Sequence, residues 1–228
     1  MSKSFNNDDL DYERIQAVVF DLGGVFLEGG PSEVAQFGMR YGMDSHVWNE
    51  LRRELFIDGD DWDRVERGEA PLDAFAETLR RRMADHGFQV TLEQARNFMR
   101  PPGSGDGSPL RPEIVEVCGR LHRVMPTALL TNNVAEWRDL WRSRIDTARL
   151  FDVVVDSSAV RMRKPEPRIY ALTEEKLGID GAHLLFVDDI GSNLKGARQR
   201  GWQTLKYEDT HDVLSVLNRV AQGRAARR

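Results

Sequence analysis

Short apolar segments that stop at a polar residue are the feature of this sequence that most constrains its fold. The first of them, Ala17–Asp21 (AVVFD), ends at an acidic residue and is followed by Gly23 and Gly24. This pattern is typical of a buried parallel strand that meets a loop. Similar segments recur later in the chain at Ala128–Thr131, Phe151–Asp156 and Leu184–Asp189, with a weaker candidate at Gln203–Tyr207.

Segments with helical spacing and capping residues lie between these strands and after the last one. They are Arg111–His122, Val134–Arg144, Pro167–Leu177, Asn193–Arg200 and Asp209–Ala221. An alternation of strands and helices indicates a parallel sheet wrapped by helices. We therefore predict an α/β protein with a Rossmann-like parallel sheet, whose polar strand ends meet at the edge where such sheets bind ligands.

A long segment after the first strand interrupts this alternation. Residues 31 to about 100 have the apolar spacing of several amphipathic helices. The next stretch, Pro101–Pro109 (PPGSGDGSP), is rich in Pro, Gly and Ser and is typical of a linker. We therefore predict a core formed by residues 1–30 and 107–228, with an inserted helical domain of residues 31–106.

Charge and hydropathy limit the kinds of partner. The 228 residues include 37 acidic and 32 basic ones, which gives a formal net charge of -5. Neither half of the chain is strongly basic, so a nucleic-acid partner is not favoured. The N-terminal stretch MSKSFNNDDLDYERIQ lacks the apolar run of a signal peptide, and no membrane span of about 18 apolar residues occurs. We expect a cytoplasmic protein, monomeric or homodimeric, that acts on a small molecule without a membrane or nucleic-acid partner.

Several residue types that carry chemistry elsewhere are interpreted here as packing or surface residues. A lone cysteine, Cys118, excludes an intramolecular disulfide and a thiolate zinc site. Trp48, Trp62 and Phe75 fit the apolar pattern of the insert, where core packing is favoured over substrate stacking. The scattered histidines lack metal-ligand spacing. They are His46, His86, His122, His183 and His211.

Polar residues at the predicted strand ends follow one another in an informative order. Asp21 closes the first strand, Thr131 and Asn132 the second, Lys164 follows the third in RKPEPRIY, and Asp188–Asp189 closes the fourth. Taken singly, each is ordinary, because such residues also form turns, loops and helix caps. The combination resembles the haloacid dehalogenase-like hydrolases, whose motifs are an aspartate, a Ser or Thr, a Lys and an acidic pair in this order.

The resemblance covers nearly the whole chain. It extends over residues 20–202 through the segments FDLGGV, LLTNN, RKPEPRIY and FVDDIGSNLKGARQRGW. The helical insert falls where one class of the family carries a C1-type cap, and VERGEAPLDAFAETL resembles that cap. KPEPRIY and the last motif also resemble the phosphatase domain of mammalian soluble epoxide hydrolases. An α-helical cap that closes over the sheet edge would exclude water and select the substrate.

The resemblance implies a magnesium-dependent phosphatase acting on a small phosphorylated metabolite. Asp21 would attack phosphorus to give an aspartyl phosphate, which water then hydrolyses. Mg²⁺ prefers octahedral oxygen ligands, which here would include Asp21, Asp189 and the carbonyl of Gly23.

Further residues would bind the phosphoryl group or orient its neighbours. The hydroxyl of Thr131 and the backbone N–H of Asn132 would bind phosphoryl oxygens, while Lys164 would balance the negative charge. Asp188 and Asn193 would orient these groups and the metal-bound water.

One position departs from the family pattern. Its phosphatases usually carry a second aspartate two residues after the nucleophile as general acid and base, where this chain has Gly23. Losing such a group forfeits roughly 10²–10⁴-fold in rate. Three hypotheses accommodate this. The chain is a phosphatase that either acts on a leaving group needing little protonation or borrows an acid from the cap, or it is a 2-haloacid dehalogenase-type hydrolase. The third hypothesis is a non-catalytic binding or regulatory protein.

Overall fold

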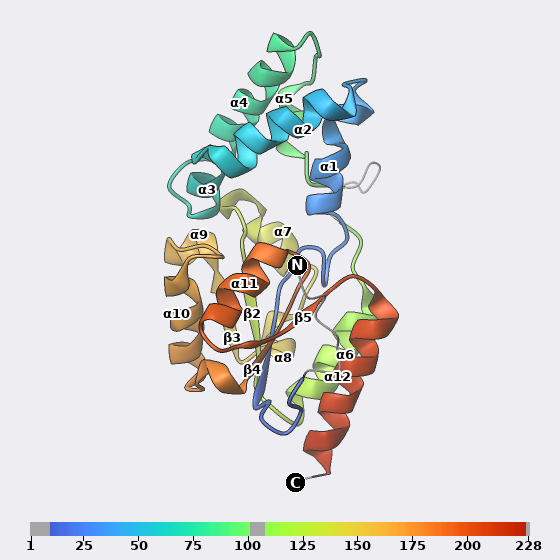
Figure 1. Cartoon of the computed structure of the whole chain (residues 1–228), viewed down its shortest axis with the longest axis vertical. Coiled ribbons are helices and arrows are strands. Elements are labelled where there is room, and N and C mark those ends of the chain that lie inside the picture. Colours follow the sequence, from blue (N-terminus) through green and yellow to red (C-terminus); the bar gives the residue numbers. More distant parts are fainter. Residues whose placement is uncertain (1–9, 101–107, 227–228) are drawn as a thin grey trace, which may run out of the picture.

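The computed structural model describes residues 10–100 and 108–226, which form an α/β core and a layer of helices set beyond one edge of its sheet (Figure 1). Most of the linker predicted at Pro101–Pro109 lies outside the described residues. Within the described ranges, none of the helices combines the length and the apolar character needed to cross a membrane.

The core is built on one parallel sheet of five strands in the order β3-β2-β1-β4-β5. The strands are β1 (Ala17–Phe20), β2 (Thr127–Thr131), β3 (Val153–Asp156), β4 (Leu184–Asp188) and β5 (Gln203–Lys206). Phe20 at the end of β1 pairs with Leu129 on one side and Val187 on the other. The predicted Rossmann-like parallel sheet is confirmed, and its carboxyl edge brings the polar strand ends together.

Helices cover both faces of the sheet, because alternate residues of each strand point to opposite faces. Val18 and Phe20 of β1 pack with α6 (Pro112–His122) and α12 (Thr210–Ala225). On the other face, Ala17 and Val19 join the cluster that includes residues of α10 (Pro167–Leu177) and α11 (Gly191–Gln199). Cys118 of α6 is buried in the first cluster, as predicted.

The insert has its own hydrophobic cluster, in which Trp48, Trp62 and Phe75 are buried. Its helices are α1 (Pro31–Arg40), α2 (Ser45–Arg53), the π-helical turn η2 (Glu54–Asp58), α3 (Asp61–Glu66), α4 (Leu72–Asp85) and α5 (Leu92–Arg96). Figure 1 shows these helices stacked above the carboxyl edge of the sheet, with α3 near the core. The short α3 was not separated in the sequence, because six residues give little periodic signal.

The segment Val134–Arg144 was predicted as one helix and is instead divided. A 3₁₀ turn, η3 (Ala135–Trp137), leads into a short helix, α7 (Arg138–Arg142). The indole of Trp137 lies against Trp62 of the insert, with ring centroids 6.3 Å apart. Such tertiary contacts override a weak local helical preference. Three further short elements also went unpredicted: α8 (Thr147–Leu150), α9 (Ser157–Val160) and η4 (Gly181–His183).

Candidate functional site

Three carboxylates gather at the carboxyl edge of the sheet. Asp21 follows β1, Asp188 ends β4 and Asp189 follows it, so the pairing of β1 with β4 brings them together. One oxygen from each lies within 4.8 Å of the others. Proximity of this kind between buried like charges is unfavourable unless a cation compensates it.

Lys164 is the cation that contacts two of these carboxylates. Its side chain is fully buried, and its Nζ lies 2.8 Å from Asp21 Oδ1 and 2.7 Å from Asp188 Oδ2. Burial acts to lower the pKa of Lys164, but Asp188 and Asp21 together raise it above its ordinary value. The ammonium therefore stays charged at neutral pH, and the group of four has a formal charge of -2 when all three carboxylates are ionised.

Asp188 and Asp189 differ in the hydrogen bonds that their oxygens accept. Asp188 accepts hydrogen bonds from Asn193 Nδ2 at 3.1 Å and from the Ile190 backbone N–H at 2.7 Å. Asp189 Oδ1, by contrast, is buried and has no hydrogen-bond donor among the described residues. Gly24 packs against the same carboxylate, and a Cβ at Gly24 would lie 2.1 Å from Asp189 Oδ2.

The pKa values reflect this shortage of positive charge. Burial raises the pKa of Asp21 well above its ordinary value, and Asp188 and Asp189 raise it further against the opposing effect of Lys164. Burial, followed by the charge of Asp188, raises the pKa of Asp189 to about 6. An orphaned carboxylate oxygen beside two other carboxylates is the donor set that a hard divalent cation such as Mg²⁺ binds. The residues present therefore fit the predicted metal.

Thr131 and Asn132 lie at the same edge, at the end of β2 and just after it. The Thr131 side chain is buried, and its Oγ1 donates to the carbonyl of Asn132 at 3.4 Å. The Asn132 side chain accepts from the Lys164 backbone N–H at 2.8 Å and donates to the Lys164 carbonyl at 2.9 Å. The sequence predicted a role for the Asn132 backbone only; its side chain fixes the main chain of the buried lysine.

Glu66 of α3 was missed in the sequence. Its side chain is only 6% exposed, and its Oε2 accepts from Arg163 Nε at 2.6 Å and from Asn132 Nδ2 at 3.3 Å. Its backbone carbonyl accepts from Ser157 Oγ at 2.6 Å. Burial raises the pKa of Glu66, while Arg163 opposes that shift. The insert is thus joined to the loops that carry Asn132 and Lys164, and an acidic residue in a helical segment gives no sequence signal of this.

Arg111 was missed as well. Its Nη1 donates to the carbonyls of Gly24, Val25 and Leu27, at 2.9, 3.2 and 3.1 Å. Its guanidinium also lies 5.1 Å from the centroid of the Tyr207 ring. Arg111 therefore fastens the loop that follows Asp21, although 84 or more residues separate them in sequence.

A cavity of about 710 Å³, counted with its open mouth, lies beside the loop that follows Asp21. Leu22 and Gly23 of the loop after Asp21 line it, together with Thr131 and Asn132. A Cβ at Gly23 would meet no atom within 4 Å, so the position of the missing aspartate opens onto free space. Trp62 of the insert also lines the cavity.

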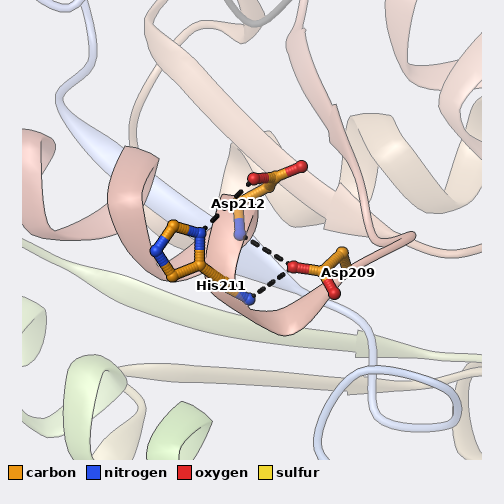
Figure 2. Close-up of side chains that lie close together, drawn as sticks. All are labelled: Asp209, His211 and Asp212. Carbon is orange, nitrogen blue, oxygen red and sulfur yellow. Dashed lines mark hydrogen bonds and ion pairs between the residues drawn. The ribbon is translucent and has the colours of Figure 1, made fainter.

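A second acidic cluster has a structural explanation. Figure 2 shows Asp209, His211 and Asp212 at the start of α12, all exposed. Asp209 Oδ1 accepts from the backbone N–H groups of His211 and Asp212 at 2.8 and 3.2 Å, which is the geometry of a helix N-cap. Capping accounts for this cluster, and the lack of a metal role expected for His211 stays a prediction.

Known proteins resemble this chain over much of its length. Acyl-CoA dehydrogenase family member 10 of Mus musculus is 29% identical over 206 residues, 89% of this chain and 19% of the relative. Bifunctional epoxide hydrolase 2 of Rattus norvegicus is 32% identical over 114 residues, 48% of this chain and 21% of the relative. The chain therefore spans about a fifth of the length of these two relatives.

A shorter relative is matched over most of its own length. Phosphoglycolate phosphatase of Escherichia coli (strain K12) is 27% identical over 213 residues, 83% of this chain and 80% of the relative.

Solved structures share the fold. A haloacid dehalogenase family enzyme of Bacteroides thetaiotaomicron, in complex with magnesium and inorganic phosphate, has a TM-score of 0.61 at 22% identity, covering 87% of this chain and 98% of its own. The L-2-haloacid dehalogenase of Xanthobacter autotrophicus has a TM-score of 0.60 at 23% identity, covering 86% and 80%. The haloacid dehalogenase-like hydrolase family matches residues 15–201, from β1 through the helix after Asp189. Since this match spans four of the five strands, the insert and every residue gathered at the carboxyl edge, the chain belongs to the haloacid dehalogenase-like hydrolases.

Proposed function

We propose that this hydrolase is a magnesium-dependent phosphatase that uses Asp21 as its nucleophile. The observation that carries the proposal is the buried group of Asp21, Asp188 and Asp189, which has one lysine for three carboxylates and an unpartnered oxygen on Asp189. A bound divalent cation would neutralise the remaining formal charge of -2. A dianionic phosphate ester could then approach a carboxylate that otherwise repels it.

In the proposed reaction, an oxygen of Asp21 forms a bond to phosphorus while the bond from phosphorus to the ester oxygen breaks. The electron pair of that bond leaves with the alcohol oxygen, and water later cleaves the aspartyl phosphate to free Asp21 and inorganic phosphate. The metal, held by Asp21, Asp189 and the Gly23 carbonyl, would supply positive charge to the phosphoryl oxygens.

The remaining residues bind and orient. Lys164, fixed by Asp188 and by the Asn132 side chain, neutralises Asp21 and the incoming phosphate. Thr131 Oγ1 and the Asn132 backbone N–H donate to phosphoryl oxygens, as proposed from the sequence. Asn193 holds Asp188 in place, because its side-chain amide donates to both carboxylate oxygens.

The helical insert, residues 31–100 of the described chain, serves as the cap in this proposal. Trp62 lines the cavity, and Glu66 contacts Arg163 and Asn132. A cap that contacts the site from above excludes water from the reacting atoms and selects the leaving group. The other domain is then the core, which consists of the sheet and the helices that flank it.

Named relatives support phosphate chemistry. One is called a phosphoglycolate phosphatase, and a structure of the same fold was solved with magnesium and inorganic phosphate.

Carbon–halogen hydrolysis is the second candidate, since halide leaves without a proton and Gly23 offers no acid. The fold is also that of an L-2-haloacid dehalogenase. Against this candidate, the adjacent pair Asp188–Asp189 leaves a buried anionic oxygen that a metal-free reaction on a haloacid does not need.

Release of inorganic phosphate from a panel of phosphorylated metabolites and para-nitrophenyl phosphate tests the proposal, with Mg²⁺ and with chelator. We expect magnesium-dependent release that disappears in Asp21→Asn and persists in Asp85→Asn, an exposed aspartate of the insert. Halide release from 2-halo acids without metal would establish the second candidate instead. Metal binding without any turnover would indicate a non-catalytic protein.

A further inference from the structure

The cavity beside the loop after Asp21 has a mainly apolar lining away from Gly23, Thr131 and Asn132. Trp62 and Met99 line it from the insert side, and Trp137, Leu140 and Trp141 line it from the segment after β2. Trp62 and Trp141 are 5% and 3% exposed, so their rings are fixed by packing. Together with the half-buried Trp137, they make this part of the lining apolar.

This lining does not suit a small polar leaving group. A two-carbon acid such as the one in phosphoglycolate would leave these apolar walls uncovered and in contact with water. A ring system would instead cover these apolar side chains. Burying apolar surface of such a ring is favourable in proportion to its area.

Charged residues line the same cavity, and they are predominantly positive. Arg100 and Arg144 line it, against the single carboxylate of Glu28. Arg144 is exposed, and its Nη1 donates to the carbonyl of Ser108 at 2.8 Å. Arg guanidinium groups bind carboxylates and phosphates in a bidentate way. A ligand that fills the cavity would therefore gain from a second anionic group.

We infer that the substrate is a phosphate monoester whose leaving group is a flat, largely apolar ring system carrying a second anionic group; this inference rests on the proposed phosphatase function. The phosphate lies at Asp21, and the rings contact Trp62, Trp137 and Trp141. The absence of an acid at Gly23 suits this class, because an aryl oxygen leaves with less need of a proton than an alkyl oxygen.

Binding of non-hydrolysable phosphonates tests the ring preference without relying on turnover. Affinities of inorganic phosphate, methylphosphonate, naphthylmethylphosphonate and phosphonoacetate are measured by calorimetry with saturating Mg²⁺. We expect naphthylmethylphosphonate to bind at least about tenfold more tightly than methylphosphonate and phosphonoacetate. In Trp137→Leu, which removes a half-buried ring, the ratio of the naphthyl to the methyl affinity should fall about fivefold.

A second pair of ligands tests the anionic group. We expect 4-carboxybenzylphosphonate to bind several-fold more tightly than benzylphosphonate, and we expect Arg144→Gln to remove most of that difference. Arg149→Gln is the matched control, since it removes an exposed arginine that does not line the cavity.

The outcomes separate this inference from the proposed function. If inorganic phosphate and methylphosphonate bind but the naphthyl group adds nothing, the ring-bearing substrate is wrong while the phosphatase proposal stands. If the carboxylate adds nothing, or adds equally in Arg144→Gln and Arg149→Gln, the second anionic group is wrong. If neither inorganic phosphate nor methylphosphonate binds with Mg²⁺, both the proposed function and this inference fail.

Discussion

Replacing Gly23 by aspartate should add the general acid and base that this chain lacks. A Cβ at Gly23 would meet no atom within 4 Å, and the residue lines the cavity next to Asp21. The φ angle of Gly23 lies outside the left-handed range that only glycine adopts readily. An aspartate side chain therefore fits there without backbone strain.

The size of the gain depends on the leaving group. A positioned acid and base contributes roughly 10²–10⁴-fold in rate, which corresponds to about 3–5 kcal/mol of activation free energy. That gain applies to an alkyl phosphate, whose oxygen must be protonated as it leaves. Para-nitrophenolate leaves as the anion, so its phosphate ester should gain little in the first step. The expected signature of Gly23→Asp is thus a kcat/KM ratio of alkyl to aryl ester that rises at least about tenfold.

The assay is phosphate release from both esters at saturating Mg²⁺, for wild type, Gly23→Asp and Gly23→Asn. Asparagine has nearly the same shape as aspartate but cannot donate and accept the proton, so Gly23→Asn should leave the ratio unchanged. Saturating metal matters because a fourth carboxylate near Asp21, Asp188 and Asp189 increases the repulsion in the metal-free site. Equal ratios in all three proteins, with Gly23→Asp folded and binding Mg²⁺, would refute the reasoning.

Three further perturbations test other parts of the site. Mg²⁺ should raise the Tm of the wild type, because it would bind the folded site. Gly24→Ala should abolish this rise, because its Cβ would displace Asp189, whereas Gly178→Ala has similar backbone strain but no clash and should keep the rise. Equal losses in the two variants would contradict this. Asp189→Asn should also abolish the rise in Tm. Without metal, lowering the pH from 7 to 5 should stabilise the wild type by about 1 kcal/mol more than this variant, because a pKa raised to about 6 makes ionised Asp189 destabilising. Parallel pH profiles of the unfolding free energy in urea would contradict that. Glu66→Ala should lower the unfolding free energy, measured by urea denaturation, by about 3 kcal/mol, because the Arg163 guanidinium loses one buried partner. A loss no larger than that in Glu77→Ala, which changes an exposed residue, would contradict this prediction.

The sequence determined the architecture of the core because strands and helices have local signatures. An apolar run of about five residues or a period of 3.6 residues is visible within a short window. All five predicted strands exist, and Pro167–Leu177 matches the α10 helix residue for residue. The order of Asp21, Thr131, Lys164 and Asp188–Asp189 was equally readable, because parallel topology places successive strand ends at one edge.

The divided segment Val134–Arg144 shows where local signals fail. Its helical pattern was real, but the contact of Trp137 with Trp62 of the insert competes with it. A propensity of a few tenths of a kcal/mol per residue yields to tertiary packing.

Only the tertiary structure decided how the site is supported. Glu66 meets Asn132 across 66 residues of sequence, and Arg111 meets Gly24 across 87. Such contacts depend on how separate elements pack, and an acidic or basic residue in an amphipathic helix looks the same whether it ends in solvent or in a buried pair. The aromatic walls of the cavity have the same origin, because Trp62 and Trp137 come from an insert and a core loop that are distant in the chain. The chain thus encodes its strands and motifs locally, while side-chain partners arise only when the folded layers are brought together.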